Sequence, residues 1–330
     1  MKHWQPREIA LLAELRARFI EGRAGEADYW RSDEELALYD QTFAARIGWK
    51  IDAALRALGA IGWQSGSRRV LDWGCGTGIA TRRILAAWPG FTSAAFHDRS
   101  ARAMAFARES VALAAGESRA DRDTLLVISH VLNELSGSAL DELLAQVRAA
   151  GEVIWIEAGT HADSRRLIAV RELLLAESDP PRVVAPCMHQ SRCGLLAPEN
   201  ARHWCHHFAT PPPGVFTDGN WSKFANLMGI DLRDLPLSFL ALDQRAAAPL
   251  PTHATRVLGH PRIYKPHALL LSCNASGVSE QKLTKRSLPD EFRQLRKGAF
   301  DRLQLMQSVD KVVAATKPLF ANEPGPSQPD

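Results

Sequence analysis

Three alternating glycines are the clearest candidate for chemistry in this sequence. An apolar run ends at Asp72, Gly74, Gly76 and Gly78 follow at every second position, and a helical pattern begins directly after them. Glycine permits a positive φ and lets bare backbone approach a ligand, while the N–H groups that open the next helix face the same place. A second apolar run leads to Asp98, where a βαβ nucleotide-binding fold holds ribose hydroxyls. The spacing therefore predicts a nucleotide-containing cofactor bound by these residues.

Four of the five cysteines form a second candidate site. Cys187, Cys193 and Cys205 occur in a loop rich in Pro, His and Trp, and Cys273 occurs on a predicted strand, whereas Cys75 belongs to the glycine loop. Thiols gathered in a loop of an intracellular chain bind metal more often than they form disulfides. Four thiolates suit either zinc or an iron–sulfur cluster, because both accept four sulfurs in a tetrahedral array. Histidines of the same loop are alternative zinc ligands: His189, His203, His206 and His207.

Strands and helices are expected to alternate around the glycine loop, which predicts a parallel sheet with right-handed crossovers. About 25 residues separate Asp98 from the next clear strand, too few for a helix, a full strand and another helix. We therefore expect the third strand to be missing or vestigial. After a first strand from Arg69, the predicted order is helix 79–88, strand 91–97, helix 100–115, strand 124–129, helix 138–149, strand 152–158 and helix 163–177.

The chain divides into regions by pattern and composition. The strands at 235–242 and 267–273 are predicted to form the antiparallel last pair of the sheet. The predicted regions are a helical segment at 1–60 with a break near Gly22 to Gly25, a Rossmann-like core at 61–178, a Cys/His-rich metal- or cluster-binding insertion at 179–220, C-terminal strands and a basic segment completing the core at 221–321, and a disordered tail at 322–330.

Composition indicates an ordinary soluble globular protein, with 46% hydrophobic and 23% charged residues among 330. The first residues lack a signal-peptide core, and no apolar run is long enough to cross a bilayer, so we expect a cytoplasmic protein. The net charge of +3 is unevenly placed, since residues 251–300 hold nine basic and three acidic side chains. Such a segment can neutralise RNA phosphates, although a solvated helix face is the plainer explanation. Its candidate RNA-binding residues are Lys282, Lys285, Arg286, Arg293, Arg296 and Lys297.

The run Asp-x-Gly-x-Gly-x-Gly resembles the first motif of class I S-adenosylmethionine-dependent methyltransferases. The resemblance implies S-adenosylmethionine as cofactor, with the glycine loop against its methionine part and Asp98 on its ribose. It also implies substrate-side groups after the fourth strand, at His130, Asn133 and Glu134. No Asp/Asn-Pro-Pro-aromatic tetrad follows Ser129, so an apparatus for methylating a base amine is not visible.

Three longer stretches resemble the methyltransferase-like assembly proteins of the small ribosomal subunit, which occur in bacteria and mitochondria. They are Val131–Leu135, Ala185–Phe208 with its cysteines and histidines, and Thr284–Arg286. The resemblance implies a 4Fe–4S cluster carried by four cysteines and a role in assembling the small subunit on its rRNA. The implied ligands are Cys187, Cys193, Cys205 and Cys273.

Two functions follow as hypotheses. The first is a non-catalytic or weakly catalytic assembly factor, in which fold and cluster shape an rRNA-binding surface and S-adenosylmethionine is at most a structural ligand. The second is an active rRNA methyltransferase with a structural zinc or iron–sulfur site. We favour the first, because the glycine loop is complete while the third-strand region and the recognised catalytic motifs are reduced or absent. The expected partner is small-subunit rRNA, without DNA or membrane, and we expect a monomer away from the ribosome.

Overall fold

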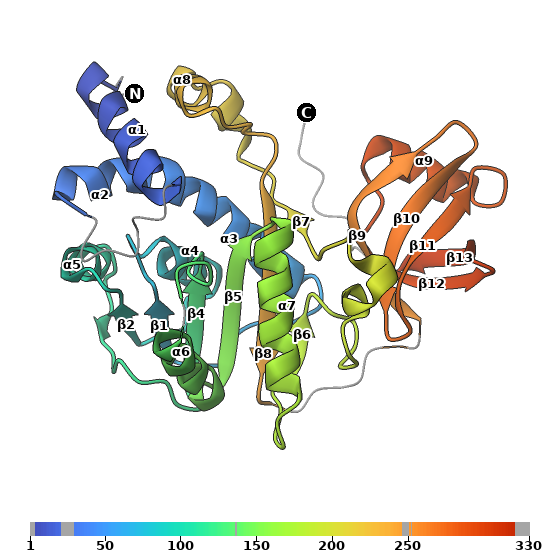
Figure 1. Ribbon diagram of the computed structural model, residues 1–330, viewed down its shortest axis with the longest axis horizontal. Helices are drawn as coiled ribbons and strands as arrows, with labels where there is room; N and C mark the ends of the chain where they lie inside the picture. Colours follow the sequence, from blue (N-terminus) through green and yellow to red (C-terminus); the bar gives the residue numbers. More distant parts are fainter. Residues whose placement is uncertain (1–3, 21–29, 136, 246–250, 252, 321–330) are drawn as a thin grey trace.

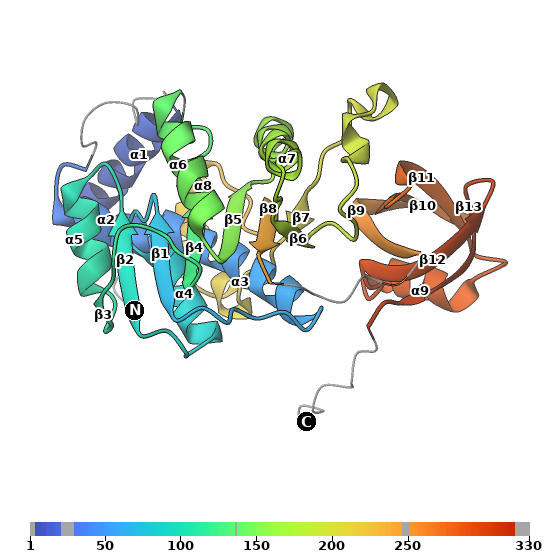
Figure 2. The same cartoon turned by 90° about the horizontal axis from the view of Figure 1, so that it is seen from below.

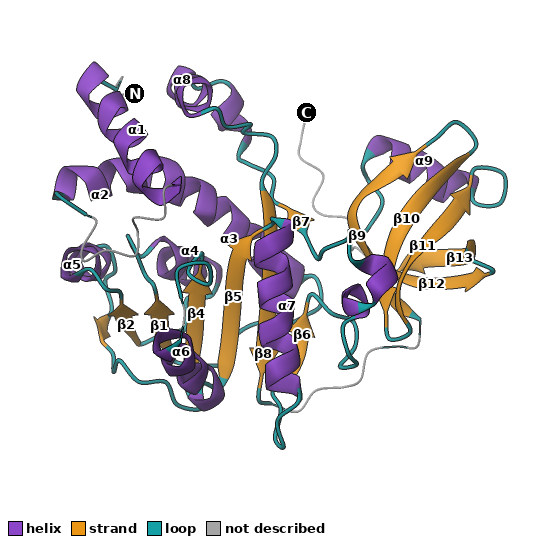
Figure 3. Cartoon of the chain, viewed as in Figure 1, coloured by secondary structure: helices purple, strands orange, loops and turns teal. Residues whose placement is uncertain are grey.

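The computed structural model places an α/β layered region beside a barrel of strands that contains a single helix (Figures 1 and 3). It describes residues 4–20, 30–135, 137–245, 251 and 253–320. The predicted break near Gly22 to Gly25 and the predicted tail at 322–330 lie outside these residues.

The first region is built on a mixed sheet. Its strand order is β3-β2-β1-β4-β5-β8-β6, with β7 also paired to β8. Strands β1, β2, β4 and β5 are parallel, and β8 runs antiparallel to both β5 and β6. This order confirms the methyltransferase-like α/β sheet. The strands are β1 (Arg69–Trp73), β2 (Ser93–His97), β3 (Ala114–Ala115), β4 (Thr124–Ser129), β5 (Glu152–Ala158), β6 (Arg182–Ala185), β7 (His207–Phe208) and β8 (Pro236–Asp243).

Helices cover both faces of this sheet because its central strands are apolar on both sides (Figure 2). Side chains of α3 and α4 pack with Val70, Val127 and Ile154 on one face. Side chains of α6 and α7 pack with Leu71, Trp155 and others on the opposite face. The helices are α3 (Ala45–Gly59), α4 (Ile79–Ala87), α5 (Ala101–Glu109), α6 (Ser138–Ala149) and α7 (His161–Leu175).

The described part of the N-terminal segment is helical, as predicted for 1–60. Helix α1 (Pro6–Ile20) packs against α2 (Asp33–Tyr39), which continues through a π-helical turn (Asp40–Ala44) into α3. Ser32 starts α2, because its hydroxyl accepts a hydrogen bond from the backbone N–H of Glu35 at 3.2 Å. A short helix, α8 (Gly219–Met228), completes this cluster by packing on α1. These helices lie over the carboxyl edge of the sheet (Figure 1).

The third strand is vestigial, as the short spacing after Asp98 predicted. Only Ala114 and Ala115 form β3, paired with Ser93 and Ala94 of β2. The other predicted strands and helices between residues 69 and 177 are present, with ends that differ by a few residues. The largest difference is α5, which stops at Glu109 instead of 115.

The predicted pairing of strands 235–242 and 267–273 is wrong. The first is β8, whose antiparallel partners are β5 and β6. The second is β10, which belongs to a closed barrel of order β10-β11-β13-β12-β9. The residue pattern of a strand does not determine which strand it pairs with, and nothing in the sequence indicated that 182–185, inside the predicted insertion, would pair with β8. The barrel consists of β9 (Ala254–Ile263), β10 (His267–Asn274), β11 (Gly277–Thr284), α9 (Pro289–Lys297), β12 (Leu303–Val309) and β13 (Val312–Pro318).

Residues of the barrel interior form their own apolar core. Val257, Leu270 and Leu283 from the strands pack on Phe292 and Leu295 of α9. Within the described residues, no helix combines the length and the apolar character needed to span a membrane.

Candidate functional site

The glycine loop follows β1 at the carboxyl edge of the sheet, where ligands of open α/β sheets bind. The N–H of Gly74 donates to the carbonyl of His97 at 2.7 Å, so the loop is fixed to the end of β2. Gly74 has φ +72°, and a Cβ there would lie 2.1 Å from Val131 Cγ1. Gly78 starts α4 at φ +74° and faces Ala107. Both outer glycines are therefore required by the packing of the protein itself.

Gly76 differs from the two glycines beside it. It has φ +51°, and no atom lies within 4 Å of the position that its Cβ would take. Its N–H donates to Asp98 Oδ2 at 3.0 Å, and Asp98 Oδ1 accepts from the N–H of Ser100 at 3.0 Å. The structure thus brings together the central glycine and the acid that the sequence singled out. Cofactor contact by Gly76 and Asp98 remains a prediction, and the open space at Gly76 is where it would occur.

Asp72 lies beneath this loop and is fully buried. Its Oδ2 accepts from the hydroxyl of Thr81 at 2.8 Å and from its N–H at 3.3 Å. Its Oδ1 has no hydrogen-bond partner among the described residues. Burial, with a smaller contribution from the Asp98 charge, raises the pKa of Asp72 to about 7, against the effect of the Thr81 hydrogen bonds. Through these bonds to Thr81, Asp72 supports both the glycine loop and the first turn of α4.

The raised pKa of Asp72 predicts a pH-dependent stability. A carboxyl with a folded pKa near 7 and an unfolded pKa near 3.8 binds more protons when folded, so stability falls as pH rises through that window. Compared with Asp72→Asn, whose amide oxygen can still accept from Thr81, the wild-type free energy of unfolding should fall by up to about 1.4 kcal/mol per pH unit. Urea unfolding of both proteins across this range measures the difference. Parallel pH profiles would contradict a protonated Asp72.

The N-terminal helices cover the glycine loop from above. Arg82 of α4 donates to the carbonyl of Thr77 at 2.8 Å and forms an ion pair with Asp40 at 2.5 Å. Tyr39 ends α2 directly before Asp40, and burial, followed by the charges of Glu134 and Asp98, raises its pKa. The predicted N-terminal helical segment thus lies against the glycine loop and the start of α4.

His130 follows β4 at the same edge and has φ +57°, an unusual value for a residue other than glycine. Its Nε2 lies 3.4 Å from Lys50 Nζ on α3, and its Nδ1 lies 3.1 Å from the hydroxyl of Ser129. Burial, and then the charge of Lys50, lowers the pKa of His130 well below its ordinary value. Burial, and then the charge of Arg46, lowers the pKa of Lys50 to about 8. Lys50 is a site residue that sequence reasoning missed, because nothing in an amphipathic helix pattern marks one lysine as buried.

Glu157 at the end of β5 holds the segment after β4 in place. Its Oε1 accepts from the N–H groups of Val131 at 3.3 Å and Leu132 at 3.1 Å, and from Trp155 Nε1 at 2.7 Å. Burial raises its pKa to about 7. Of the other predicted substrate-side residues, Asn133 is exposed and Glu134 forms an ion pair with Arg99 at 3.4 Å.

The four predicted cysteine ligands come from separate parts of the chain, and three of them share one apolar cluster. Cys193 and Cys273 are buried in one apolar cluster, against which Cys205 packs. Burial raises the pKa of Cys205, and the nearby thiolates of Cys187, Cys273 and Cys193 raise it further. Cys187 follows β6, Cys205 precedes β7 and Cys273 lies near the end of β10, so the site joins the sheet to the barrel. Cys75 lies in the glycine loop and takes no part in it.

A buried arginine lies among these thiols. Arg256 of β9 is 4% exposed and donates through Nε to the carbonyl of Pro186 at 2.5 Å. The Nη2 atom of Arg256 is buried with no hydrogen-bond partner among the described residues. Burial lowers its pKa, and the charges of Cys205, Cys187 and Cys273 oppose that effect. An uncompensated buried cation is costly, so this arrangement calls for negative charge in the same space.

The histidines of the loop divide into two groups. His189 Nε2 lies 3.8 Å from Cys273 Sγ, and His207 Nε2 lies 3.6 Å from Cys205 Sγ. His206 instead stacks on Trp204, and His203 contacts Arg202. Among the residues that the structure describes, no three His, Cys, Asp or Glu side chains are grouped so that they could hold one metal ion. The cluster-binding role of the insertion therefore belongs with the proposals below.

The predicted RNA-binding residues lie on the barrel. Lys282 is on β11, and Lys285 and Arg286 follow its end, where all three are exposed. Arg293, Arg296 and Lys297 are on α9, and Arg293 forms an ion pair with Asp290 at 2.8 Å. The six side chains thus come from β11, from the turn after it and from α9, rather than from one helix face.

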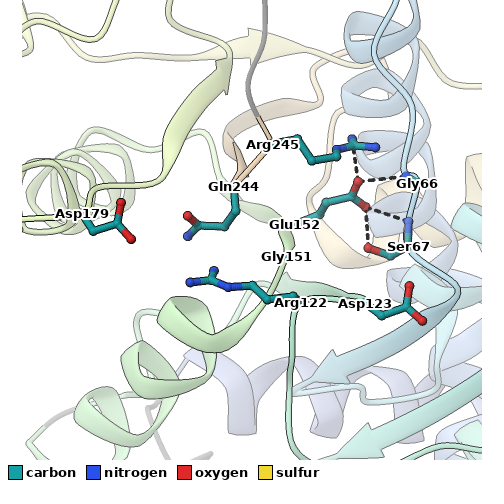
Figure 4. A pocket seen from close by; sticks show the side chains of 9 residues that line it. All are labelled: Gly66, Ser67, Arg122, Asp123, Gly151, Glu152, Asp179, Gln244 and Arg245. Carbon is teal, nitrogen blue, oxygen red and sulfur yellow. Dashed lines mark hydrogen bonds and ion pairs between the residues drawn. The ribbon is translucent and has the colours of Figure 1, made fainter.

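A cavity of about 390 Å³ lies at the opposite, amino edge of the sheet (Figure 4). Its most buried charge is Glu152, whose carboxylate accepts from the N–H of Gly66 at 2.8 Å and pairs with Arg245 at 2.6 Å. The hydroxyl of Ser67 donates to the same carboxylate at 2.8 Å. These partners hold the Glu152 carboxylate and attach the segment before β1 to the start of β5. The polar lining of this cavity therefore has a structural role.

Several known proteins are similar to this chain. The plantazolicin methyltransferase BpumL in complex with SAH shares 12% identity over 72% of this chain and 100% of that chain, with a TM-score of 0.36. A Thermoplasma acidophilum protein, 1320, shares 12% identity over 60% of this chain and 95% of that chain, with a TM-score of 0.36. No curated protein matches the sequence. The family described as mitochondrial small ribosomal subunit Rsm22 matches residues 43–302, which include the sheet and most of the barrel. The chain belongs to the Rsm22 family of the small ribosomal subunit.

Proposed function

We propose that this protein is an assembly factor of the small ribosomal subunit that binds rRNA and holds a 4Fe–4S cluster on Cys187, Cys193, Cys205 and Cys273. The proposal is supported by one observation: Cys193 and Cys273 are buried in a cluster against which Cys205 packs, and Arg256 lies opposite Cys273 in the β9–β10 pairing and bonds to Pro186, next to Cys187. The Nη2 of Arg256 is buried without a partner among the described residues. S-adenosylmethionine, bound at the glycine loop, is proposed as a structural ligand.

The chemistry of the donor set fits a cluster. Four thiolates give an iron–sulfur site a net negative charge, and the buried guanidinium of Arg256 would compensate part of it. A second buried arginine, Arg171, donates to the carbonyls of His189 at 3.2 Å and Ser191 at 3.0 Å, which shapes the segment between the first two cysteines. When bound, the cluster would couple the fold of residues 187–205 to the barrel. Zinc on the same thiolates is the alternative.

The basic residues of the barrel give the proposal a test with RNA. Charge reversal at Lys285, Arg286 and Arg293 should weaken binding to small-subunit rRNA and reduce its salt dependence, because fewer phosphates are neutralised. The slope of log K against log salt should become shallower by about 0.7 for each lost phosphate contact on single strands. Filter binding over a salt series measures both quantities.

Lys223→Glu is the matched control, since Lys223 is an exposed lysine on α8, outside the barrel. If the wild-type protein binds rRNA and the triple variant has the same salt slope, RNA binds at another surface of the protein. Absence of rRNA binding by the wild-type protein would contradict the proposed function itself.

An active rRNA methyltransferase is the second candidate, and the contact between Lys50 and His130 favours it. The two side chains are 3.4 Å apart at the carboxyl edge of the sheet, and burial lowers the pKa of both, so an uncharged imidazole is available as a proton acceptor. Calorimetry with S-adenosylmethionine, followed by transfer of a labelled methyl group to small-subunit rRNA, separates the candidates. Binding without transfer supports the structural ligand, and transfer that is lost in His130→Ala supports the enzyme.

A further inference from the structure

The order in which the barrel strands pair indicates which type of barrel it is. Numbered from β9 as the first strand, its five strands pair in the order 1-2-3-5-4-1, since β9 pairs with both β10 and β12. The third and fifth strands, β11 and β13, are parallel. The only helix described within the barrel, α9, lies between the third and fourth strands. This is the Greek-key topology of an OB-fold, which binds oligomeric ligands on strands two and three and on the loops 1–2 and 4–5.

Three loops meet at one end of this barrel, and we call them the loop end. They are Tyr264–Pro266 between β9 and β10, 285–288 after β11, and Asp310–Lys311 between β12 and β13. The N–H of Lys285 donates to the carbonyl of Pro266 at 2.9 Å, and the N–H of Lys282 donates to the carbonyl of Lys311 at 2.8 Å. Backbone hydrogen bonds therefore hold the loops together as one surface.

Exposed apolar side chains concentrate at the loop end. Seven large hydrophobic side chains are exposed among the described residues, and four of them lie in these loops or directly beside them: Ile263 at 43%, Tyr264 at 46%, Val309 at 66% and Val312 at 38%. The Tyr264 ring stacks on His267 with centroids 5.0 Å apart and an angle of 25° between planes. An exposed aromatic ring that is already oriented by its neighbour is a platform on which a nucleic-acid base can stack.

The charge around this platform is positive. Lys265, Lys282, Lys285, Arg286 and Lys311 are all exposed, and among the described residues none of them forms an ion pair. Of the acidic residues nearby, Glu280 is paired with Arg262, and Asp310 lies within the loop end itself. Aromatic and apolar groups surrounded by lysines match the bases and phosphates of a single strand, whose bases are free to stack.

We propose that the loop end of the barrel binds single-stranded RNA, with Tyr264 stacking on a base and Lys265, Lys285 and Lys311 contacting phosphates. The inference rests on the proposed function, from which it takes RNA as the partner, and it adds the strand state and the stacking residue. Duplex RNA fits this surface poorly, because its bases are already stacked within the helix.

Fluorescence anisotropy with the full-length protein tests the inference. The probe is a labelled single-stranded RNA of about 12 nucleotides, within the roughly 4–16 that one such barrel covers. Tyr264→Ala should weaken binding about tenfold, and Tyr264→Phe should keep the wild-type affinity because it keeps the ring. Lys265→Glu should weaken binding and make the salt slope shallower by about 0.7. The same RNA annealed to its complement should bind at least tenfold more weakly.

The matched controls are Phe216→Ala and Lys223→Glu. Phe216 is 50% exposed, much like Tyr264, and both control residues lie outside the barrel. Equal affinity for single-stranded and duplex RNA, or equal losses in Tyr264→Ala and Phe216→Ala, would overturn the inference. If the wild-type protein binds small-subunit rRNA and Tyr264→Ala binds it equally well, this inference fails and the proposed function stands. If the wild-type protein binds the short single strand but neither rRNA nor the small subunit, the proposed function fails instead.

Discussion

Cys273→Ser is expected to abolish most of the iron–sulfur absorbance of protein purified without oxygen. The residue lies on β10 of the barrel, 68 positions beyond Cys205, yet it is buried in the same apolar cluster as Cys193. Loss of one thiolate removes a corner ligand of the proposed cluster, and the tie between barrel and sheet weakens with it. Visible absorbance and iron content measure the loss, and limited proteolysis of residues 187–205 measures the loosening.

Cys75→Ser is the matched control, since Cys75 is also buried but belongs to the glycine loop. It should keep the full colour. A colourless wild-type protein with one zinc per chain would contradict the iron–sulfur cluster but would be consistent with the four cysteine ligands. Full metal retention in Cys273→Ser would remove the fourth ligand, and His189, 3.8 Å from that thiol, would be the first replacement to test.

The second large effect is expected at the glycine loop. Gly76→Val should abolish S-adenosylmethionine binding in calorimetry, because its side chain would enter the open space at the loop where the cofactor is proposed to lie. The variant also carries the strain of a branched side chain at φ +51°. That strain has to be separated from the loss of space.

Gly229→Val separates them, because Gly229 has φ +59°, ends α8 and likewise has no atom within 4 Å of its Cβ position. Both variants should lose similar stability in thermal unfolding, and only Gly76→Val should lose the ligand. Unchanged affinity in Gly76→Val, or no binding by the wild-type protein, would leave the glycine loop with a structural role alone.

Sequence alone predicted the layered α/β core well because its signals are local. Strands such as 124–129 and 152–158 have apolar centres, at 125–128 and 153–156, and glycines mark the turn after β1 because they adopt its positive φ without strain. The vestigial third strand also followed from sequence, since chain length limits which elements fit after Asp98. The cysteines were visible by their spacing in the chain.

Only the tertiary structure decided which strands pair. The segment 267–273 reads as a strand in either setting, and long-range contacts placed it in the barrel rather than beside β8. The same contacts brought the guanidinium of Arg256 among the thiols and Lys50 against His130. The sequence pattern of β9 does not mark Arg256 as buried, and the pattern of α3 does not mark Lys50.

The loop end of the barrel shows the same division. Tyr264, Lys285 and Lys311 are separated by up to 47 positions, and no motif in the sequence connects them. They meet because β11 and β13 are parallel neighbours and because β9 and β10 form a hairpin. Sequence determined the local elements and the residue types available for chemistry. The closure of the barrel decided which of them share a surface, since that choice depends on packing between segments distant in the chain.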